Sequence, residues 1–368
     1  MPELKIDMTY ITTLATAKPQ HKYDQSALAD FMVNYMSRSE GDDRMIRYLF
    51  EKSKINSRYS VLPDFTEKGA LKKLYTDKHP TVGQRMEVFQ QEALPLAQEA
   101  CAKAMKMCDD SDQLPTHIIT ISCTGMHAPG LELELCQLLK LPANTERLAI
   151  NFMGCYAAFQ GMKMADYICK TTPDAKVLVV AVELCSLHFL ADFNESQLRA
   201  NALFADGAAA MIISNKAGQK PWKLSAFTSQ FLSKGEKDMT WKIANEAFKM
   251  DLSAYVPALI QSGIRPLLDG CLSKLLLTTD QIDTWAIHPG GVKILEAFEK
   301  EMKLDKNALQ SSRKILAEYG NMSSVTILVL LESLWSAEEE AKDRQIFAAG
   351  FGPGLSLEAA VIHQLASK

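Results

Sequence analysis

The chain has 368 residues, of which 47% are hydrophobic and 23% are charged, and its formal net charge at pH 7 is -4. This length and composition predict a soluble globular protein with one large two-lobed domain or two to three smaller ones. The negative charge argues against a nucleic-acid-binding protein, which normally has a strong basic excess. No window approaches the roughly 18 uninterrupted apolar residues that a membrane span needs, so we expect none.

Cysteine usage and the N-terminus both point to a cytoplasmic protein. The first twenty residues have no apolar core followed by a small-residue cleavage site, so they do not resemble a secretory signal. The eight cysteines form no CxxC pair, and most lie in apolar runs, as reduced thiols do. There is no HExxH motif, and His117 and His127 lack a third ligand at metal spacing, so we expect no metal site.

The first half of the chain alternates helical and strand patterns. Residues 24–55 and 83–107 have the apolar spacing of helices. HIITISCTG, residues 117–125, predicts a buried strand; an amphipathic helix in LELELCQLLK and a strand in RLAINFMG follow. After Gly154, apolar residues recur at helical spacing. Cys155 is therefore predicted to lie where a strand passes into a helix.

The middle of the chain continues this alternation. KVLVVAVEL, residues 176–184, predicts a strand that is buried on both faces. LRANALFADGAAAMIIS predicts a helix, an Asp-Gly turn and a strand, whereas the Lys-rich stretch LSKGEKDMTWK, residues 232–242, is expected to be a loop or boundary. A long helix is expected at about 252–277, and DTWAIHPGG then predicts a strand that ends at His288, a turn and a new helix.

The last part of the chain predicts a helix through AEYGNMSSVTILVLLESLWS and two strands, in RQIFAAGFG and LSLEAAVIH. Strands and helices that alternate in this way predict an α/β protein with largely buried sheets.

Cys155 is a candidate nucleophile because a helix N-terminus favours an anion. A free thiol has a pKa of about 8.5, so only about 3% is thiolate at pH 7. The helix end contributes roughly 0.3–1 kcal/mol, whereas lowering the pKa by two to three units requires about 3–4 kcal/mol. A cation must therefore act with it. On its own, a Cys in an apolar setting is more often an ordinary core residue.

His288 and Asn321 are the other two candidates. His288 ends a predicted strand and precedes Pro-Gly-Gly, so its ring is expected at the edge of a sheet. Asn321, in EYGNMSS, is most simply a turn or cap residue, but an Asn amide can also donate to a developing oxyanion. A Cys, a His and an Asn together are what a thiolate nucleophile, its cationic partner and an enolate-stabilising donor require.

Five short motifs, in their order and spacing, carry a resemblance over nearly the whole chain. They are GCYAAFQG around Cys155, LFADGAAA around Phe204, WAIHPGG around His288, EYGNMSS around Asn321 and the terminal GFGPG. The chain resembles the type III polyketide synthases of the chalcone and stilbene synthase family. This resemblance implies a thiolase-like αβαβα layered sandwich of two similar halves, residues 1–214 and 215–368, and a homodimer.

The resemblance also implies a mechanism. Cys155 accepts an acyl group from an acyl-CoA, malonyl-CoA then loses carbon dioxide, and the enolate attacks the cysteine thioester; repeated extension and cyclisation give a pyrone or an aromatic ring. The His288 ring and the Asn321 amide would stabilise the enolate oxygen, and His288 as imidazolium would activate Cys155. Phe204 would stand between the coenzyme A tunnel and the cavity. No metal or redox cofactor is implied.

Coenzyme A is expected to meet a basic patch near the N-terminus. Lys52 matches a phosphate-contacting position of the family, whereas Met45 and Tyr48 replace basic residues; Arg44 and Arg47 are expected to substitute for them. The charge pattern alone favours a solvated helix face.

Several cavity residues depart from those of the plant enzymes. Met250 replaces a second gatekeeping Phe, Trp241 falls near a Gly position, and small hydroxyl-bearing residues are replaced by Cys123, Cys185 and His188. Ser323, from EYGNMSS, is also expected to line the cavity. An apolar, reshaped cavity favours a fatty acyl starter and an alkylpyrone or alkylresorcinol product, although the bulk of Trp241 favours a small starter instead.

Two other functions remain open at this stage. A ketoacyl-ACP synthase III shares the Cys, His and Asn chemistry but takes its acyl groups from a carrier protein. A catalytically silent relative would act only as a binding partner and would carry no acyl group on Cys155.

Overall fold

The computed structural model describes residues 8–65, 73–76, 79–108, 113–337 and 343–366. The strands are β1 Tyr10–Ala17, β2 His21–Asp24, β3 Ser57–Ser60, β4 His117–Ser122, β5 Glu146–Asn151, β6 Lys176–Leu184, β7 Asp206–Ser214, β8 Trp222–Phe231, β9 Met239–Ile243, β10 Phe248–Leu252, β11 Thr284–Ile287, β12 Arg344–Gly352 and β13 Ser356–Gln364. The helices are α1 Gln25–Met36, α2 Glu40–Lys52, α3 Val82–Lys106, α4 Leu131–Leu138, α5 Ala157–Thr171, α6 Glu195–Leu203, α7 Val256–Leu275, α8 Val292–Met302, α9 Gln310–Tyr319 and α10 Ser324–Ser336.

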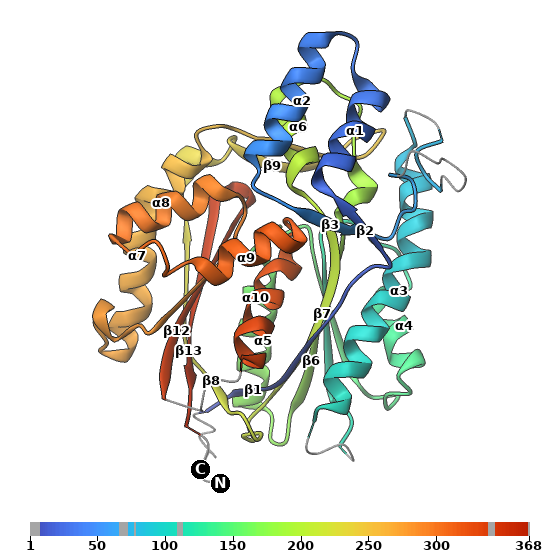
Figure 1. Ribbon diagram of the computed structural model, residues 1–368. Helices are drawn as coiled ribbons and strands as arrows, with labels where there is room; N and C mark the ends of the chain where they lie inside the picture. The colour runs from blue at the N-terminus through green and yellow to red at the C-terminus, as the bar shows by residue number, and fades with distance from the viewer. Residues whose placement is uncertain (1–7, 66–72, 77–78, 109–112, 338–342, 367–368) are drawn as a thin grey trace.

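Two groups of strands join into one sheet of nine strands, in the order β11-β12-β13-β8-β1-β7-β6-β4-β5. The two groups meet where β1 pairs with β8, and among the described residues this pairing covers Tyr10 with Lys223 and Ile11 with Trp222. Such a short pairing lets the two groups of strands diverge and enclose helices between them (Figure 1).

The helices form layers on both sides of and between these strands. α5 and α10 contact each other and lie in the middle, against β1, β4, β6 and β7 on one side and β11 and β13 on the other. α3 covers the outer face of β1, β6 and β7, and α7 covers the outer face of β8 and β13 (Figure 1). This is the αβαβα order that we predicted. All nine residues of β6 are buried, as a strand covered on both faces requires.

The predicted helix through residues 317–336 is wrong at its centre. α9 ends at Tyr319, and α10 begins only at Ser324. The intervening turn contains Gly320 with φ 72° and Ser323 with φ 49°, both outside the helical region. The apolar spacing runs through this break, so periodicity alone did not detect it.

Two further segments differ from the sequence prediction. The expected helix over residues 24–55 is two helices, α1 and α2, because Ser39 caps the second by accepting from the Asp42 backbone N–H. The Lys-rich stretch expected to be a loop contains β9, which pairs with β10 in a two-stranded sheet outside the main sheet. No helix within the described ranges is both long and apolar enough to cross a membrane.

Glu183, on β6, is a fully buried carboxylate that links the two halves of the chain. One of its oxygens accepts hydrogen bonds from the Cys123 backbone N–H at 2.9 Å and from the Thr124 hydroxyl at 3.0 Å. The other accepts from the Ser324 hydroxyl at the start of α10. Burial raises the pKa of Glu183 to about 7, although these hydrogen bonds oppose the shift.

This pKa predicts how stability depends on pH. Between the ordinary pKa of 4.5 and about 7, the folded state keeps a proton that the unfolded state releases. The contribution of Glu183 to stability is therefore present below pH 4.5 and is lost as the pH rises through 7, by about 3 kcal/mol at 1.36 kcal/mol per pKa unit. Glu183→Gln, which cannot ionise, should melt at an increasingly higher temperature than the unmutated protein across this window.

Thermal unfolding followed by circular dichroism from pH 4.5 to pH 8 measures this difference. Glu195→Gln is the control, because the Glu195 side chain is 61% exposed. Melting temperatures that run parallel for Glu183→Gln and the unmutated protein would contradict the prediction.

Candidate active site

A sharp turn after β5 places Cys155 at the N-terminal end of α5. Phe152 and Gly154 have φ values of 60° and 87°, so the chain turns through left-handed conformations. A Cβ atom at Gly154 would lie 2.3 Å from Pro353 Cδ, so only glycine fits both this conformation and this space. Cys155 follows and is 2% exposed. The predicted junction of strand and helix is confirmed.

His288 extends from the end of β11, where its backbone N–H donates to the Ala349 carbonyl at 2.8 Å. The side chain is buried, and within the described part of the chain neither ring nitrogen has a hydrogen-bond partner. A buried imidazole usually satisfies at least one nitrogen. Both nitrogens of His288 are thus available to a bound molecule.

Asn321 lies in the turn between α9 and α10, and hydrogen bonds fix its amide. Its backbone N–H donates to the Leu203 carbonyl at 2.9 Å. Its side-chain Oδ1 accepts from the Ser323 backbone N–H at 2.9 Å, and its Nδ2 donates to the Gly290 carbonyl at 3.3 Å. The amide therefore presents its donor, Nδ2, towards the loop that carries His288.

Two cavities meet at Cys155 and Phe204, which line both. We call the one that contains His288 and Asn321 the outer cavity; its free volume is about 140 Å³. The one behind Phe204, the inner cavity, has a free volume of about 30 Å³. The inner cavity is lined by Cys123, Thr124, Gly154, Cys155, Cys185, His188, Phe189, Gln197, Ala200, Asn201, Phe204, Trp241, Met250, Ser323 and Pro353.

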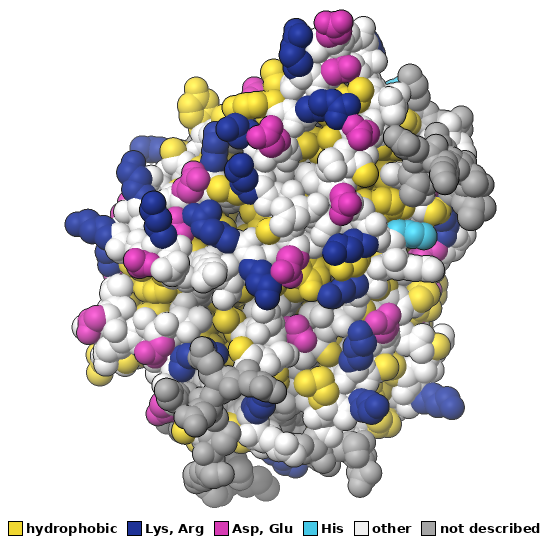
Figure 2. All heavy atoms as spheres, viewed as in Figure 1, with side chains coloured by type: hydrophobic (Ala, Val, Ile, Leu, Met, Phe, Trp, Pro, Cys, Tyr) yellow, Lys and Arg dark blue, Asp and Glu magenta, His cyan; other side chains and the backbone are white. Residues whose placement is uncertain are grey.

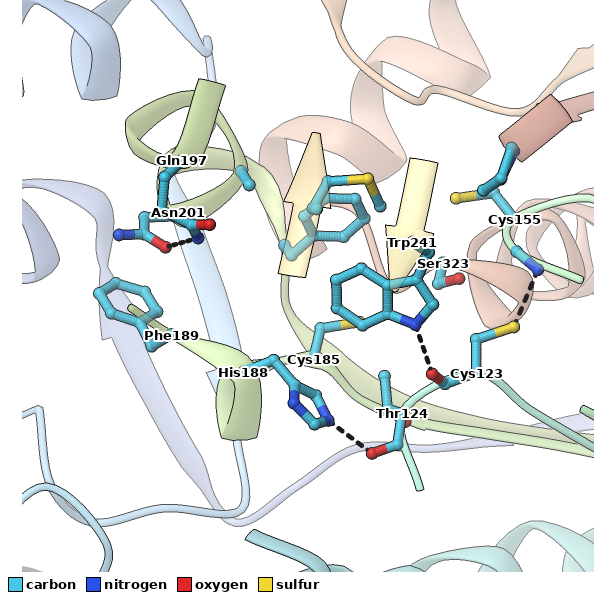
Figure 3. A pocket seen from close by; sticks show the side chains of 15 residues that line it. Cys123, Thr124, Cys155, Cys185, His188, Phe189, Gln197, Asn201, Trp241 and Ser323 are labelled. Carbon is cyan, nitrogen blue, oxygen red and sulfur yellow. Dashed lines mark hydrogen bonds between the residues drawn. The ribbon is translucent and has the colours of Figure 1, made fainter. Parts of the chain in front are cut away.

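Trp241 and His188 line the inner cavity (Figure 3), and together with Phe248, which packs against both rings, they form an aromatic wall. The His188 ring stacks on Phe248 with ring centres 4.3 Å apart and meets Trp241 edge-on at 5.5 Å. Trp241 Nε1 donates to the Cys123 carbonyl at 2.7 Å. The wall is thus anchored to the same loop that carries Cys123.

The hydrogen bonds of His188 define its tautomer. Nδ1 accepts from the Phe248 backbone N–H at 3.1 Å, and Nε2 lies 2.6 Å from the Thr124 carbonyl, to which it must donate. Burial lowers the pKa of His188 to about 3, so the ring is neutral at pH 7. His188 is therefore part of the wall and not a cation for the nucleophile.

Burial opposes charge on both members of the proposed catalytic pair. It raises the pKa of Cys155 to about 12, against hydrogen bonds from Ser323 and Asn321 that favour the thiolate. It lowers the pKa of His288 to about 3. Neither group is charged alone at pH 7, so a thiolate and an imidazolium require each other here.

The structure brings together ten of the residues predicted from the sequence. Cys155, His288, Asn321, Phe204, Met250, Cys123, Cys185, His188, Trp241 and Ser323 all line the inner or the outer cavity.

Of the three basic residues predicted to bind coenzyme A, only one lines a cavity. Lys52 lines the outer cavity, whereas Arg44 and Arg47 lie exposed on α2, outside the lining of both cavities, and Arg47 is paired with Asp30. Arg58 is buried and donates to the Phe204 carbonyl at 2.6 Å, so it supports Phe204 from behind.

Some lining residues were missed by the sequence analysis. Arg199 on α6 and Lys293 at the start of α8 line the outer cavity beside Lys52. Gln197 and Asn201 line the inner cavity and are joined by a hydrogen bond of 2.9 Å. Gln197 and Asn201 are one helical turn apart, just before Phe204, and this spacing could have indicated that both side chains lie on one face of the helix.

On the face shown in Figure 2, Lys and Arg side chains gather over α8 and towards α2, with acidic side chains among them. Across the described ranges, no group of three His, Cys, Asp or Glu side chains stands close enough to hold a metal ion.

Comparisons with known proteins agree with the resemblance. Residues 6–217 match the family described as chalcone and stilbene synthases, N-terminal domain, and residues 223–366 match its C-terminal domain. The chain is 31% identical over 357 residues to the "Alpha-pyrone synthesis polyketide synthase-like Pks18" of Mycobacterium tuberculosis, covering 95% of this chain and 89% of that protein.

Two further relatives extend the comparison. The "Probable polyketide synthase 1" of Dictyostelium discoideum is 27% identical over 358 residues, which are 95% of this chain but only 11% of that protein. The crystal structure of PKS-I from the brown alga Ectocarpus siliculosus superposes with a TM-score of 0.91 and 27% identity, covering 97% of this chain and 98% of that one. The predicted thiolase-like fold is confirmed, and the chain belongs to the chalcone and stilbene synthase family and is a type III polyketide synthase.

Proposed function

We propose that the protein loads an acyl group from an acyl-CoA on Cys155, extends it with malonyl-CoA and cyclises the product to a pyrone or a resorcinol, starting from a fatty acyl group. The observation that carries this proposal is the convergence of Cys155, His288 and Asn321 on the outer cavity. The relative from Mycobacterium tuberculosis whose name includes alpha-pyrone synthesis supports the pyrone product in particular.

Loading begins when the Cys155 proton moves to His288 and the sulfur attacks the acyl-CoA carbonyl. The new bond joins sulfur to the acyl carbon, and coenzyme A leaves with a proton. Because burial penalises each charge separately, the two charges form together, as a pair within the outer cavity. A neutral resting pair also keeps the thiol unreactive until a substrate is positioned.

Decarboxylation of malonyl-CoA develops negative charge on the thioester oxygen. The ring N–H of His288, which has no hydrogen-bond partner among the described residues, and the oriented Nδ2 of Asn321 are the donors for that oxygen. The enolate carbon then attacks the Cys155 thioester, and the thiolate leaves. The two donors act on malonyl-CoA, whereas the sulfur acts on the starter, so the two steps can be separated by mutation.

We expect Cys155→Ala to lose acyl loading while retaining some decarboxylation of malonyl-CoA. Asn321→Ala should still load but should decarboxylate at least about 100-fold more slowly, the usual effect of removing one oxyanion donor. Intact-protein mass spectrometry measures loading, and release of carbon dioxide measures decarboxylation. Cys136→Ala, on α4 away from both cavities, is the control. Equal loss of both steps in both variants would contradict this division of roles.

We propose that Lys52, Arg199 and Lys293 contact the phosphates of coenzyme A. All three line the outer cavity, and they come from three different helices. Lys293 also lies in the first turn of α8, where the helix end favours an anion. Arg199 is paired with Glu195, so Lys52 and Lys293 are the better positions to test.

Lys52→Ala and Lys293→Ala should each raise KM for an acyl-CoA about threefold to fivefold, because an exposed charge pair contributes up to about 1 kcal/mol. They should leave KM unchanged for the N-acetylcysteamine thioester of the same acyl group, which has no phosphates. Lys300→Ala, also exposed on α8, is the control. An equal rise for both substrates would indicate a general defect and reject these contacts.

The inner cavity is proposed to hold the acyl chain. Apart from Gln197 and Asn201 its lining is largely apolar, which favours an aliphatic starter. Its free volume of about 30 Å³ has room for about two water molecules at 10–15 Å³ each. A longer acyl chain must therefore displace a residue that lines the cavity, and we expect Trp241 or the flexible Met250 to move.

We predict that Trp241→Ala shifts the preferred starter towards longer acyl chains, because it removes the largest side chain of the aromatic wall. The measurement is kcat/KM across a series of acyl-CoA chain lengths. Trp241→Phe keeps an aromatic ring but not the hydrogen bond to Cys123, and it should change the preference little. A higher kcat/KM of the unmutated protein for p-coumaroyl-CoA than for every alkyl-CoA would reject the aliphatic starter.

The homodimer implied by the resemblance stays a prediction. β5 lies at one edge of the sheet and is largely exposed, so it is the strand that we expect to meet a second copy.

A further inference from the structure

Ser323 has a backbone conformation that serine rarely adopts. Its φ is 49° and its ψ is -126°, and its side chain is buried. A residue with a Cβ atom is strained in this region, whereas glycine is not. Such strain persists only where the surroundings hold it, and it is typical of functional sites.

The surrounding contacts hold the backbone of Ser323 firmly. Its N–H donates to Asn321 Oδ1 at 2.9 Å, and its carbonyl accepts from the Thr326 N–H at 3.2 Å. On either side, the Met322 N–H donates to the Thr326 hydroxyl at 2.7 Å, and the Ser324 hydroxyl binds Glu183. The two hydrogen bonds just given for Ser323 itself use backbone atoms, so a glycine would make both. The hydroxyl group is what glycine could not supply.

That hydroxyl group belongs to the same cavity as the nucleophile. Ser323 and Cys155 line the same inner cavity (Figure 3). Of the side chains that favour the Cys155 thiolate and so hold its pKa down, Ser323 contributes most, ahead of Asn321. The other titratable groups around Cys155 are Glu183, Cys123 and Cys185, which oppose a negative charge there, and His288 across the outer cavity.

We propose that Ser323 is a positioning residue for the nucleophile: its hydroxyl donates to the Cys155 sulfur in the thiolate state, and serine is kept in a glycine-favouring conformation for that contact. The proposal rests on the proposed role of Cys155 as the acyl-accepting thiol. One turn then serves both partial reactions. The backbone N–H of Ser323 orients the Asn321 amide, and its hydroxyl orients the Cys155 sulfur.

Two substitutions separate the hydroxyl from the strain. Ser323→Ala removes the hydroxyl and keeps the Cβ atom, whereas Ser323→Gly removes both. The pH dependence of Cys155 alkylation by iodoacetamide, followed on the Cys155 peptide by mass spectrometry, reports the thiolate. In both variants we expect alkylation at each pH below the Cys155 pKa to slow about tenfold, as a rise of about one pKa unit requires. Ser323→Gly alone should melt higher than the unmutated protein, by about 2 °C.

Decarboxylation of malonyl-CoA is the second measurement. It should persist in both variants, because the backbone N–H that orients Asn321 is unchanged. Loss of decarboxylation along with slower alkylation would reveal a collapsed turn and overturn the proposal. An unchanged alkylation profile in both variants would also overturn it, as would a shift in Ser323→Ala alone, which would assign the effect to the backbone.

The proposed function can be rejected without rejecting the role of Ser323. If the unmutated protein acquires no acyl group on Cys155 from acyl-CoA, the loading step is wrong, whereas the alkylation profiles still report whether Ser323 acts on the thiol.

Discussion

Two backbone hydrogen bonds fix the geometry on which the site depends. The Asn321 N–H donates to the Leu203 carbonyl at 2.9 Å, and the Ala205 N–H donates to the Asn321 carbonyl at 2.8 Å. They join a segment from the first half of the chain to a turn from the second half and place Phe204 beside Asn321. Arg58, buried behind them, donates to the Phe204 carbonyl and holds the same segment. A single contact between distant segments of the chain thus sets both the junction between the two cavities and the position of Asn321, the proposed oxyanion donor.

Burial is the second constraint. It strengthens hydrogen bonds to a developing negative charge, but it also makes charges on the site's own residues costly. A buried oxyanion donor is worth more than an exposed one, because no water competes with it. The same burial makes a lone thiolate at Cys155 or a lone imidazolium at His288 costly. The site offsets this with neutral donors in fixed positions, including the Asn321 amide, instead of with permanent cations. Permanent cations are found instead in the lining of the outer cavity, where Lys52 and Lys293 are exposed to water.

The sequence predicted the features whose signals are local. The strand before Cys155, the helix after it and the turn after His288 each depend on a few neighbouring residues, and the structure has all three. Periodicity missed the break between α9 and α10, although Gly-Asn indicated a turn or cap at Asn321, because apolar residues continue on both sides of it. The conformation of Ser323 is held by its contacts with Asn321 and Thr326 and by the hydrogen bond of its neighbour Ser324 to Glu183. Those contacts come from tertiary structure, which periodicity does not report.

The sequence analysis also missed polar features that depend on tertiary structure. β9 begins within the polar, Lys-rich stretch at residues 232–242, which favours a loop, and it forms a strand because β10 supplies the pairing partner. Lys293 and Arg199 look like solvated helix residues until the fold places them beside one cavity with Lys52. The motifs singled out Cys155, His288 and Asn321, which line one cavity, whereas the position of the cations that also line it depends on how the helices pack.

The hairpin of β9 and β10 also bears on how this enzyme could diversify. It supplies Trp241 and Met250 to the inner cavity yet lies outside the nine-stranded sheet. Cys155 and His288, in contrast, follow the ends of sheet strands, and Asn321 precedes a central helix. A substitution in the hairpin can therefore reshape the chamber without disturbing the elements that hold the reacting groups. Evolution towards a new starter molecule can therefore proceed through substitutions in this hairpin. Paralogues that share one reaction could differ in product through the hairpin alone.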